Sequence, residues 1–194
     1  MKRKSLLSVA AAVTILAASN PAAAEPLSVA EYEYQPMTYA GHGRLEACGV
    51  RFLVVTHQRM AFDGSVNVFL IGSSNLTMVF KIIARSGDEA LKAVPISFAW
   101  MRLRNGSNTL DFKRIPGEIP EAYVAYSTAG DSKEIRLLFD LVASGAVVGV
   151  SEEGKESDHT FDIPPAAERV VFDRLFECTD QLVDQALSAA QGHQ

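Results

Sequence analysis

The chain has two cysteines, Cys48 and Cys178, and a thiol can serve as metal ligand, nucleophile or half of a disulfide. Neither cysteine has a second ligand at the spacing typical of zinc sites. Cys178 lies in the stretch RLFECTDQLV, which has the pattern of a helix rather than of an activated turn. These observations disfavour a metal site and a catalytic thiol, and leave a disulfide or a pair of buried free thiols.

Histidine is the other residue type that could supply acid–base chemistry near neutral pH. The four histidines are scattered without the paired spacing of a zinc site, so no metal or cofactor is predicted. His57, in VVTHQRM, would project on the same side as Leu53 and Val55 if its strand is regular. It is the one weak candidate for a general base. No G-x-S-x-G, S-x-x-K or H-E-x-x-H motif accompanies it, so no catalytic residue is predicted.

Basic residues concentrate on either side of the Asn105-Gly106 turn signal. If the two flanking segments form a hairpin, four cations gather at one end of the domain: Arg102, Arg104, Lys113 and Arg114. Such a patch could bind an anionic envelope component or an acidic partner. The alternative is edge-strand charge that prevents association between sheets.

Two further clusters have simpler interpretations. Glu152–Asp158 (EEGKESD) concentrates carboxylates that could hold a divalent cation loosely, but a solvated hairpin tip is the default. Phe98 and Trp100, in SFAWM, are interpreted as ordinary core aromatics.

The N-terminus has the pattern of a signal peptide. Lys2, Arg3 and Lys4 precede an uncharged apolar run, and Ala22-Ala23-Ala24 supplies the small residues of a cleavage site. Residues 1–24 are therefore predicted to be removed, although an uncleaved anchor is the alternative. No later segment is long and apolar enough to span a bilayer. The mature chain is expected to be periplasmic or secreted, without a transmembrane segment.

Export affects both the cysteines and the charge. Two thiols in one small domain usually pair in an oxidising compartment, which predicts a Cys48–Cys178 disulfide. Removal of residues 1–24 takes away three basic residues and no acidic one, so the net charge changes from −5 to −8. An acidic chain repels phosphate backbones, and no nucleic acid is expected as a partner.

The mature chain is predicted to form one domain dominated by strands. Residues 25–46 are an irregular or edge-strand lead-in, and residues 47–163 form an antiparallel β-sandwich or barrel-like domain of about eight strands. Turn signals recur through this range, among them Asp63-Gly64, and the segment EIRLLFDLV is assigned to a strand.

Residues 164–190 are predicted to form a long amphipathic helix of the same domain, with 191–194 as a tail. Pro164-Pro165 suits a first helical turn, and an apolar stripe follows along Val171, Leu175, Cys178 and Leu182. The disulfide would attach this helix to the first long strand. Strands such as RFLVV are apolar on both faces, so either the helix covers a second sheet face or the interior admits a ligand.

No known family is recognised in these residues. The leading hypothesis is an exported, non-catalytic cell-envelope protein that binds another macromolecule. One alternative is a carrier of a small hydrophobic ligand in a β-lined cavity. A second alternative is a hydrolase that uses His57.

Overall fold

The structure is a computed structural model that describes residues 25–72, 75–87, 91–106, 112–127, 133–155 and 158–191. In these ranges the chain is mainly β, as predicted, with two sheets and two helices. Eight strands have five or more residues, and three further strands have two or three. The predicted signal peptide and residues 192–194 lie outside the described ranges, so cleavage after Ala24 stays a prediction.

The larger sheet has seven strands in the order β2-β3-β4-β5-β9-β8, with β6 beside β5, and all its pairs are antiparallel. Its strands are β2 (Val29–Gly41), β3 (Arg44–Thr56), β4 (Met60–Ile71), β5 (Asn75–Ser86), β6 (Lys92–Val94), β8 (Lys113–Ile115) and β9 (Tyr123–Ser127). The hairpin β2–β3 turns at His42 and Gly43, both with positive φ, which matches the right-handed twist of the strands.

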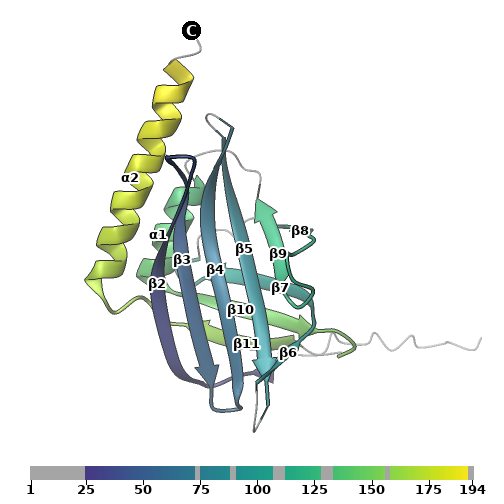
Figure 1. Cartoon of the computed structure of the whole chain (residues 1–194). Helices are drawn as coiled ribbons and strands as arrows, with labels where there is room; N and C mark the ends of the chain where they lie inside the picture. The colour runs from purple at the N-terminus through teal and green to yellow at the C-terminus, as the bar shows by residue number, and fades with distance from the viewer. Residues whose placement is uncertain are drawn as a thin grey trace, which may run out of the picture.

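The smaller sheet has the order β1-β11-β10-β7. It contains β1 (Glu25–Pro26), β7 (Ile96–Leu103), β10 (Ala146–Glu152) and β11 (Asp158–Ile163). β1 runs parallel to β11, whereas the other pairs are antiparallel. Its strands cross behind those of the larger sheet in Figure 1, which is the orthogonal way of packing two sheets.

The core lies between the two sheets. Alternate residues of β3, among them Cys48, Val50, Phe52 and Val54, are fully buried because successive side chains of a strand point to opposite faces. Phe62 from the larger sheet stacks on Phe161 from the smaller one, with ring centroids 4.2 Å apart. We call the face of the larger sheet that carries these residues its inner face.

Helix α1 (Lys133–Ser144) corrects the assignment of EIRLLFDLV to a strand. The segment fits a period of two, but its buried residues are Glu134, Leu138, Leu141 and Val142, a helical spacing. A short apolar run satisfies both periodicities, and only the tertiary contacts decide between them. α1 packs against α2 and against β4, β5 and β7, so it contacts both sheets.

Helix α2 (Arg169–Gln191) confirms the predicted C-terminal helix but begins later than expected. Pro164 and Pro165 precede it in an extended segment, where the amide of Ala166 donates to the carbonyl of Val142 at 2.9 Å. Val171, Leu175, Cys178 and Leu182 are buried, as the stripe predicted. No described helix is long and apolar enough to cross a membrane.

The helix does not cover a second face of the larger sheet. α2 packs on β2 and β3 on the inner face, the same face that the smaller sheet covers (Figure 1). On the opposite, outer face Leu53 is 38 % exposed. The expectation that both faces of RFLVV are buried is therefore wrong for the outer one.

The structure selects one of the two options predicted for the lead-in and corrects one predicted turn. The lead-in 25–46 contains β1 and the long edge strand β2, so it is an edge strand rather than an irregular segment. Asp63-Gly64 is not a turn: β3 ends at Thr56, and Gly64 lies inside β4 opposite Phe52. A Cβ at Gly64 would overlap the Phe52 ring, so this glycine makes room for an aromatic side chain in the core.

Candidate functional site

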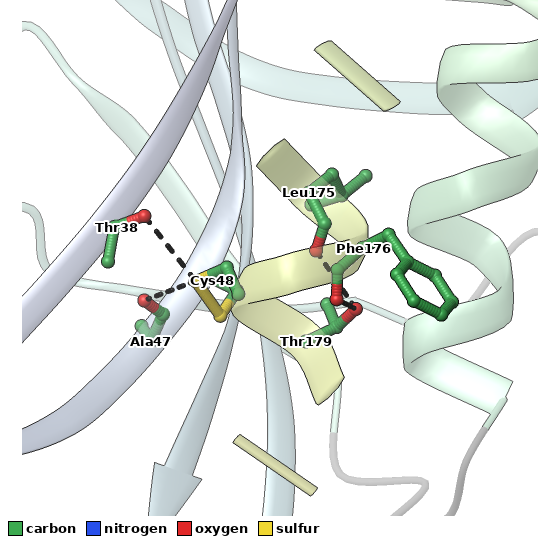
Figure 2. Close-up of a disulfide and its surroundings, with 7 residues drawn as sticks. Thr38, Ala47, Cys48, Leu175, Phe176 and Thr179 are labelled. Atoms are coloured by element: carbon green, nitrogen blue, oxygen red, sulfur yellow. Dashed lines mark hydrogen bonds between the residues drawn. A yellow bond between two sulfur atoms is a disulfide. The ribbon is translucent and has the colours of Figure 1, made fainter. Parts of the chain in front are cut away.

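The predicted Cys48–Cys178 disulfide is confirmed, with 5.8 Å between the two Cα atoms. It joins β3 to the middle of α2 (Figure 2). The hydroxyl of Thr38 on β2 donates to the Cys178 sulfur at 3.4 Å. The same sulfur lies 3.9 Å from the Ala47 carbonyl, a contact without a proton because both cysteines are bonded. The bridge is structural and attaches the helix to two neighbouring strands.

His57 lies in the turn after β3 rather than on the strand, and it is exposed. Its backbone amide donates to the carbonyl of Ser28 at 2.9 Å. The expectation that its side chain shares a face with Leu53 and Val55 is therefore wrong, because the strand ends one residue earlier.

The four basic residues do not form a hairpin patch. β7, which ends just before Arg104, pairs with β10, whereas Lys113 and Arg114 lie on β8, which pairs with β9 in the other sheet. Arg104 forms a salt bridge with Asp162 at 3.0 Å. The Arg114 guanidinium donates to the Ser97 carbonyl near the start of β7, roughly 20 Å of extended strand away from Arg104.

The predicted acidic loop contains a buried group that sequence reasoning missed. Glu152 belongs to β10 and is 9 % exposed, so its carboxylate is not part of a solvated tip. It contacts the His159 ring at 2.8 Å and the Lys155 ammonium at 2.7 Å. The other nitrogen of His159 lies 3.4 Å from the carboxylate of Glu25 on β1. This network joins the N-terminal strand to β10 and β11.

The two aromatics of β7 differ. Trp100 lies against Gly149, where a Cβ would overlap the indole ring, and its Nε1 donates to Asp158 at 3.4 Å. Phe98 is 51 % exposed, so its assignment to the core is wrong; it packs edge-on against Tyr123.

The outer face of the larger sheet offers a better-formed candidate site. The 116–122 segment between β8 and β9 packs over one side of it through Ala122, which contacts the small cluster of Ile83 and Val124. Beside that segment lie two adjoining depressions of about 300 and 230 Å³. We call them together the outer trough. Its polar lining residues are Tyr39, Arg51, Asp63, Ser65, Asn67, Lys81 and Glu118, and its apolar ones include Met37, Phe69, Val79, Ile83, Val124 and residues 115–117.

An aromatic pair lies at one end of the outer trough. Tyr39 on β2 stacks on Phe69 on β4, with ring centroids 5.9 Å apart and an interplanar angle of 28°. Ala47 lies between them on β3 and pairs with both residues. The small side chain of Ala47 lets the two rings approach each other across the intervening strand.

Opposite charges are paired in the outer trough. Arg51 on β3 donates to both carboxylate oxygens of Asp63 on β4, each at 2.7 Å. The hydrogen bond and then the charge of Asp63 raise the pKa of Arg51 above its ordinary value. Lys81 on β5 lies 3.9 Å from Glu118. The trough therefore combines donors and acceptors without a large excess of either charge.

Asn67 forms the polar floor of the outer trough. The residue is only 5 % exposed, and its amide nitrogen donates to the Ser65 hydroxyl at 3.1 Å. Its Oδ1 has no hydrogen-bond partner in the described ranges. Gly49 makes room for it, since a Cβ there would overlap both Oδ1 and the Val66 carbonyl. A buried acceptor without a partner is costly unless water or a ligand supplies a donor.

The side chains that line the outer trough are of the kinds that bind a ligand through hydrogen bonds and aromatic contacts. An aromatic face, a hydroxyl, an amide and a bidentate ion pair can orient a polar ligand. Among the described residues, no group of three or more histidine, cysteine or carboxylate side chains is arranged to hold a metal ion. Sequence reasoning missed this surface, although Arg51, Asp63, Ser65 and Asn67 occupy alternate positions on two strands that face one way once the register is known.

Comparison of the chain with protein-family profiles, with curated protein sequences and with solved structures gave no match.

Proposed function

We propose that the chain is an exported, non-catalytic cell-envelope protein that binds another macromolecule through the outer trough. The observation that carries this proposal is the position of the trough. It lies on the face of the larger sheet opposite the core, where side chains with hydrogen-bonding capacity stand on a rigid antiparallel ladder. Sites built on strands hold their side chains more exactly than sites on loops.

The rest of the fold supports this role by keeping the sheet rigid. The inner face carries the smaller sheet, α1 and α2, and the disulfide attaches α2 to β3. Arg51, which lies in the trough, is three residues after Cys48 on the same strand. A partner that binds the outer face would therefore meet a preorganised surface, which lowers the entropy cost of association.

The predicted compartment fits this role. The signal-peptide pattern of residues 1–24 predicts export. A disulfide is compatible with an oxidising compartment.

Neither alternative function gains a specific observation in its favour. The space between the sheets is occupied by large side chains, with Phe52, Phe62 and Phe80 fully buried, where a carrier would need room for its ligand. His57 lies exposed in a turn.

A capture experiment with matched charge reversals tests the proposal. The immobilised mature protein is exposed to an envelope extract from its own source, beside the variants Lys81→Glu in the outer trough and Arg102→Glu on the smaller sheet. We expect the wild type and Arg102→Glu to retain the same macromolecule. Lys81→Glu should lose most of it, because the change removes a hydrogen-bond donor from the trough and places a carboxylate beside Glu118. Retention that Arg102→Glu abolishes and Lys81→Glu leaves intact would assign binding to the other sheet and overturn the proposal.

A further inference from the structure

We propose that the macromolecule bound by the outer trough is an unbranched, uncharged glycan, laid across the strands with one sugar ring on Tyr39. This inference rests on the proposed function and deepens it by naming the ligand class. It is carried by the juxtaposition of an exposed aromatic face with a buried, unpartnered amide oxygen on one rigid sheet face.

The Tyr39 ring is the platform on which we expect a sugar ring to stack. Its side chain is 36 % exposed, so part of the ring is available to a ligand, while stacking on Phe69 fixes its orientation. The face of an aromatic ring is electron-rich and apolar, and it complements the C–H groups on one face of a sugar ring. A ring held in place by a second ring loses little side-chain entropy when a ligand binds.

Hydroxyl groups of a sugar would meet both donors and acceptors beside this platform. Asp63 and Ser65 follow each other at alternate positions on β4, and the Arg51 guanidinium lies against Asp63. Asn67 lines the trough, and its oxygen is an acceptor without a described partner, to which a sugar hydroxyl can donate. Each hydroxyl can donate and accept at once, which suits a surface where both kinds of group are interleaved.

The charge of the site argues against an anionic polymer. The two cations nearest the floor, Arg51 and Lys81, are each paired with a carboxylate, Asp63 and Glu118 respectively. A polyanion is bound by unpaired cations whose counterions it releases. An uncharged ligand can instead form hydrogen bonds with the side chains of these ion pairs, whose opposite charges already offset each other.

The position of the trough on a sheet face argues against an extended peptide. Peptides that add to sheets bond to the free backbone groups of an edge strand. β3, β4 and β5 lie inside the sheet, and their backbone groups are used in the ladder on both sides. A ligand lying across them meets side chains only, which suits a chain of hydroxyl-bearing rings.

The test uses the purified mature protein and linear tetrasaccharides of glucose, galactose, mannose and N-acetylglucosamine as probes, with binding measured by titration calorimetry. We expect at least one probe to bind. Tyr39→Ala should lower that affinity by at least about tenfold, because an aromatic anchor carries a large share of binding energy. The matched control is Tyr32→Ala. Tyr32 is 39 % exposed on the same strand, but it lies an odd number of residues from Tyr39, so its side chain points to the opposite face of the sheet.

A second variant guards against a folding defect in Tyr39→Ala. Tyr39→Phe keeps the ring and its stacking on Phe69, so it should retain binding, and Tyr39→Ala should lose binding while it keeps the native circular dichroism spectrum. Failure of all four probes to bind at millimolar concentration would overturn the glycan assignment, as would binding lost in Tyr32→Ala and kept in Tyr39→Ala. If no probe binds but the capture experiment retains a protein that Lys81→Glu releases, the proposed function stands and the glycan assignment is wrong. If the capture experiment also fails, the proposed function and the glycan assignment are both wrong.

Discussion

Gly49 and Asn67 face each other across β3 and β4, and together they illustrate how single residues shape the outer trough. The missing side chain of Gly49 leaves room for the Asn67 amide, and the Asn67 oxygen is left without a described partner. Gly64 has the opposite role on the inner face, where it makes room for the Phe52 ring. Each glycine in these strands is thus explained by the neighbour that it accommodates.

Gly64→Ala is expected to destabilise the protein by about 1–3 kcal/mol, the range typical of overpacking a core. The added methyl group overlaps the fully buried Phe52 ring. Phe52→Leu in the same chain removes that overlap, so the double variant should be less destabilised than the sum of the two single variants. Urea denaturation of all four proteins measures the coupling. Simple additivity would contradict the steric explanation.

The disulfide closes a loop with a sequence separation of 130 residues. For a loop of this length the chain-entropy model assigns about 4–5 kcal/mol of stabilisation. The double variant Cys48→Ala/Cys178→Ala should therefore lose about that free energy of unfolding and keep its circular dichroism spectrum where it still folds. Reduction of the wild type with dithiothreitol should lower the denaturation midpoint similarly and leave the double variant unchanged.

The raised pKa of Tyr34 predicts how the free energy of unfolding changes at alkaline pH. Burial, and then the neighbouring Tyr32, raise the pKa of Tyr34 above its ordinary value of 10.0. The folded chain keeps the phenol neutral where the unfolded chain ionises it, so this stabilisation is complete below pH 10 and declines as the pH rises further. Its hydroxyl has no hydrogen-bond partner in the described part of the chain.

Tyr34→Phe should therefore leave stability at pH 7 within about 1 kcal/mol of the wild type, since no described hydrogen bond is lost. The variant should lose less stability than the wild type between pH 9 and pH 11. Urea denaturation at those pH values measures both effects. Parallel pH profiles for the two proteins would show that Tyr34 ionises equally in the folded and unfolded states.

At the scale of elements, α2 has a buried half and a projecting half. The buried stripe ends at Leu182, and the C-terminal end of the helix extends past the ends of the strands in Figure 1. Leu182 is fully buried, whereas Leu187 is 56 % exposed on the same helix. The two leucines are a matched pair for measuring how firmly the helix is held.

Leu182→Ala should destabilise the protein by about 2–5 kcal/mol, the cost of removing a buried leucine side chain and leaving a cavity. Leu187→Ala should change stability by less than about 0.5 kcal/mol, because the change is exposed and alanine favours helices. Thermal and urea denaturation of both variants provide the comparison. Equal losses would show that the end of α2 is packed against something beyond the described residues.

At the scale of the whole molecule, two crossed sheets enclose one core, and three devices close it. α1 contacts strands of both sheets, α2 is bonded covalently to β3, and β1 is held to β11 near the Glu25–His159 contact. This arrangement leaves the outer face of the larger sheet as the broad surface that carries the trough.

The mature N-terminus is predicted to be Glu25. Secretion of the full-length chain from a host with a signal peptidase should give a product that begins EPLSV, as read by intact mass and N-terminal sequencing. The cell fraction that contains the product checks export at the same time. A mature chain that retains residues 1–24 would support the uncleaved anchor instead.

Local patterns determined much of this protein. Alternating apolar residues predict the strands, since side chains of a strand point alternately to two faces, and the apolar stripe from Val171 to Leu182 predicts α2. The disulfide follows from two cysteines and a signal-peptide pattern. Each of these inferences needs only residues close together in the sequence, or a rule about the compartment.

Tertiary structure alone decided the rest. The segment that forms α1 fits both periodicities, and its packing against strands of both sheets selects the helix. Arg102 and Arg114 flank one turn signal yet lie on strands of different sheets, because strand pairing is a long-range choice. The outer trough brings Tyr39, Asn67 and Lys81 together from three strands, and only the register of those strands places them on one face.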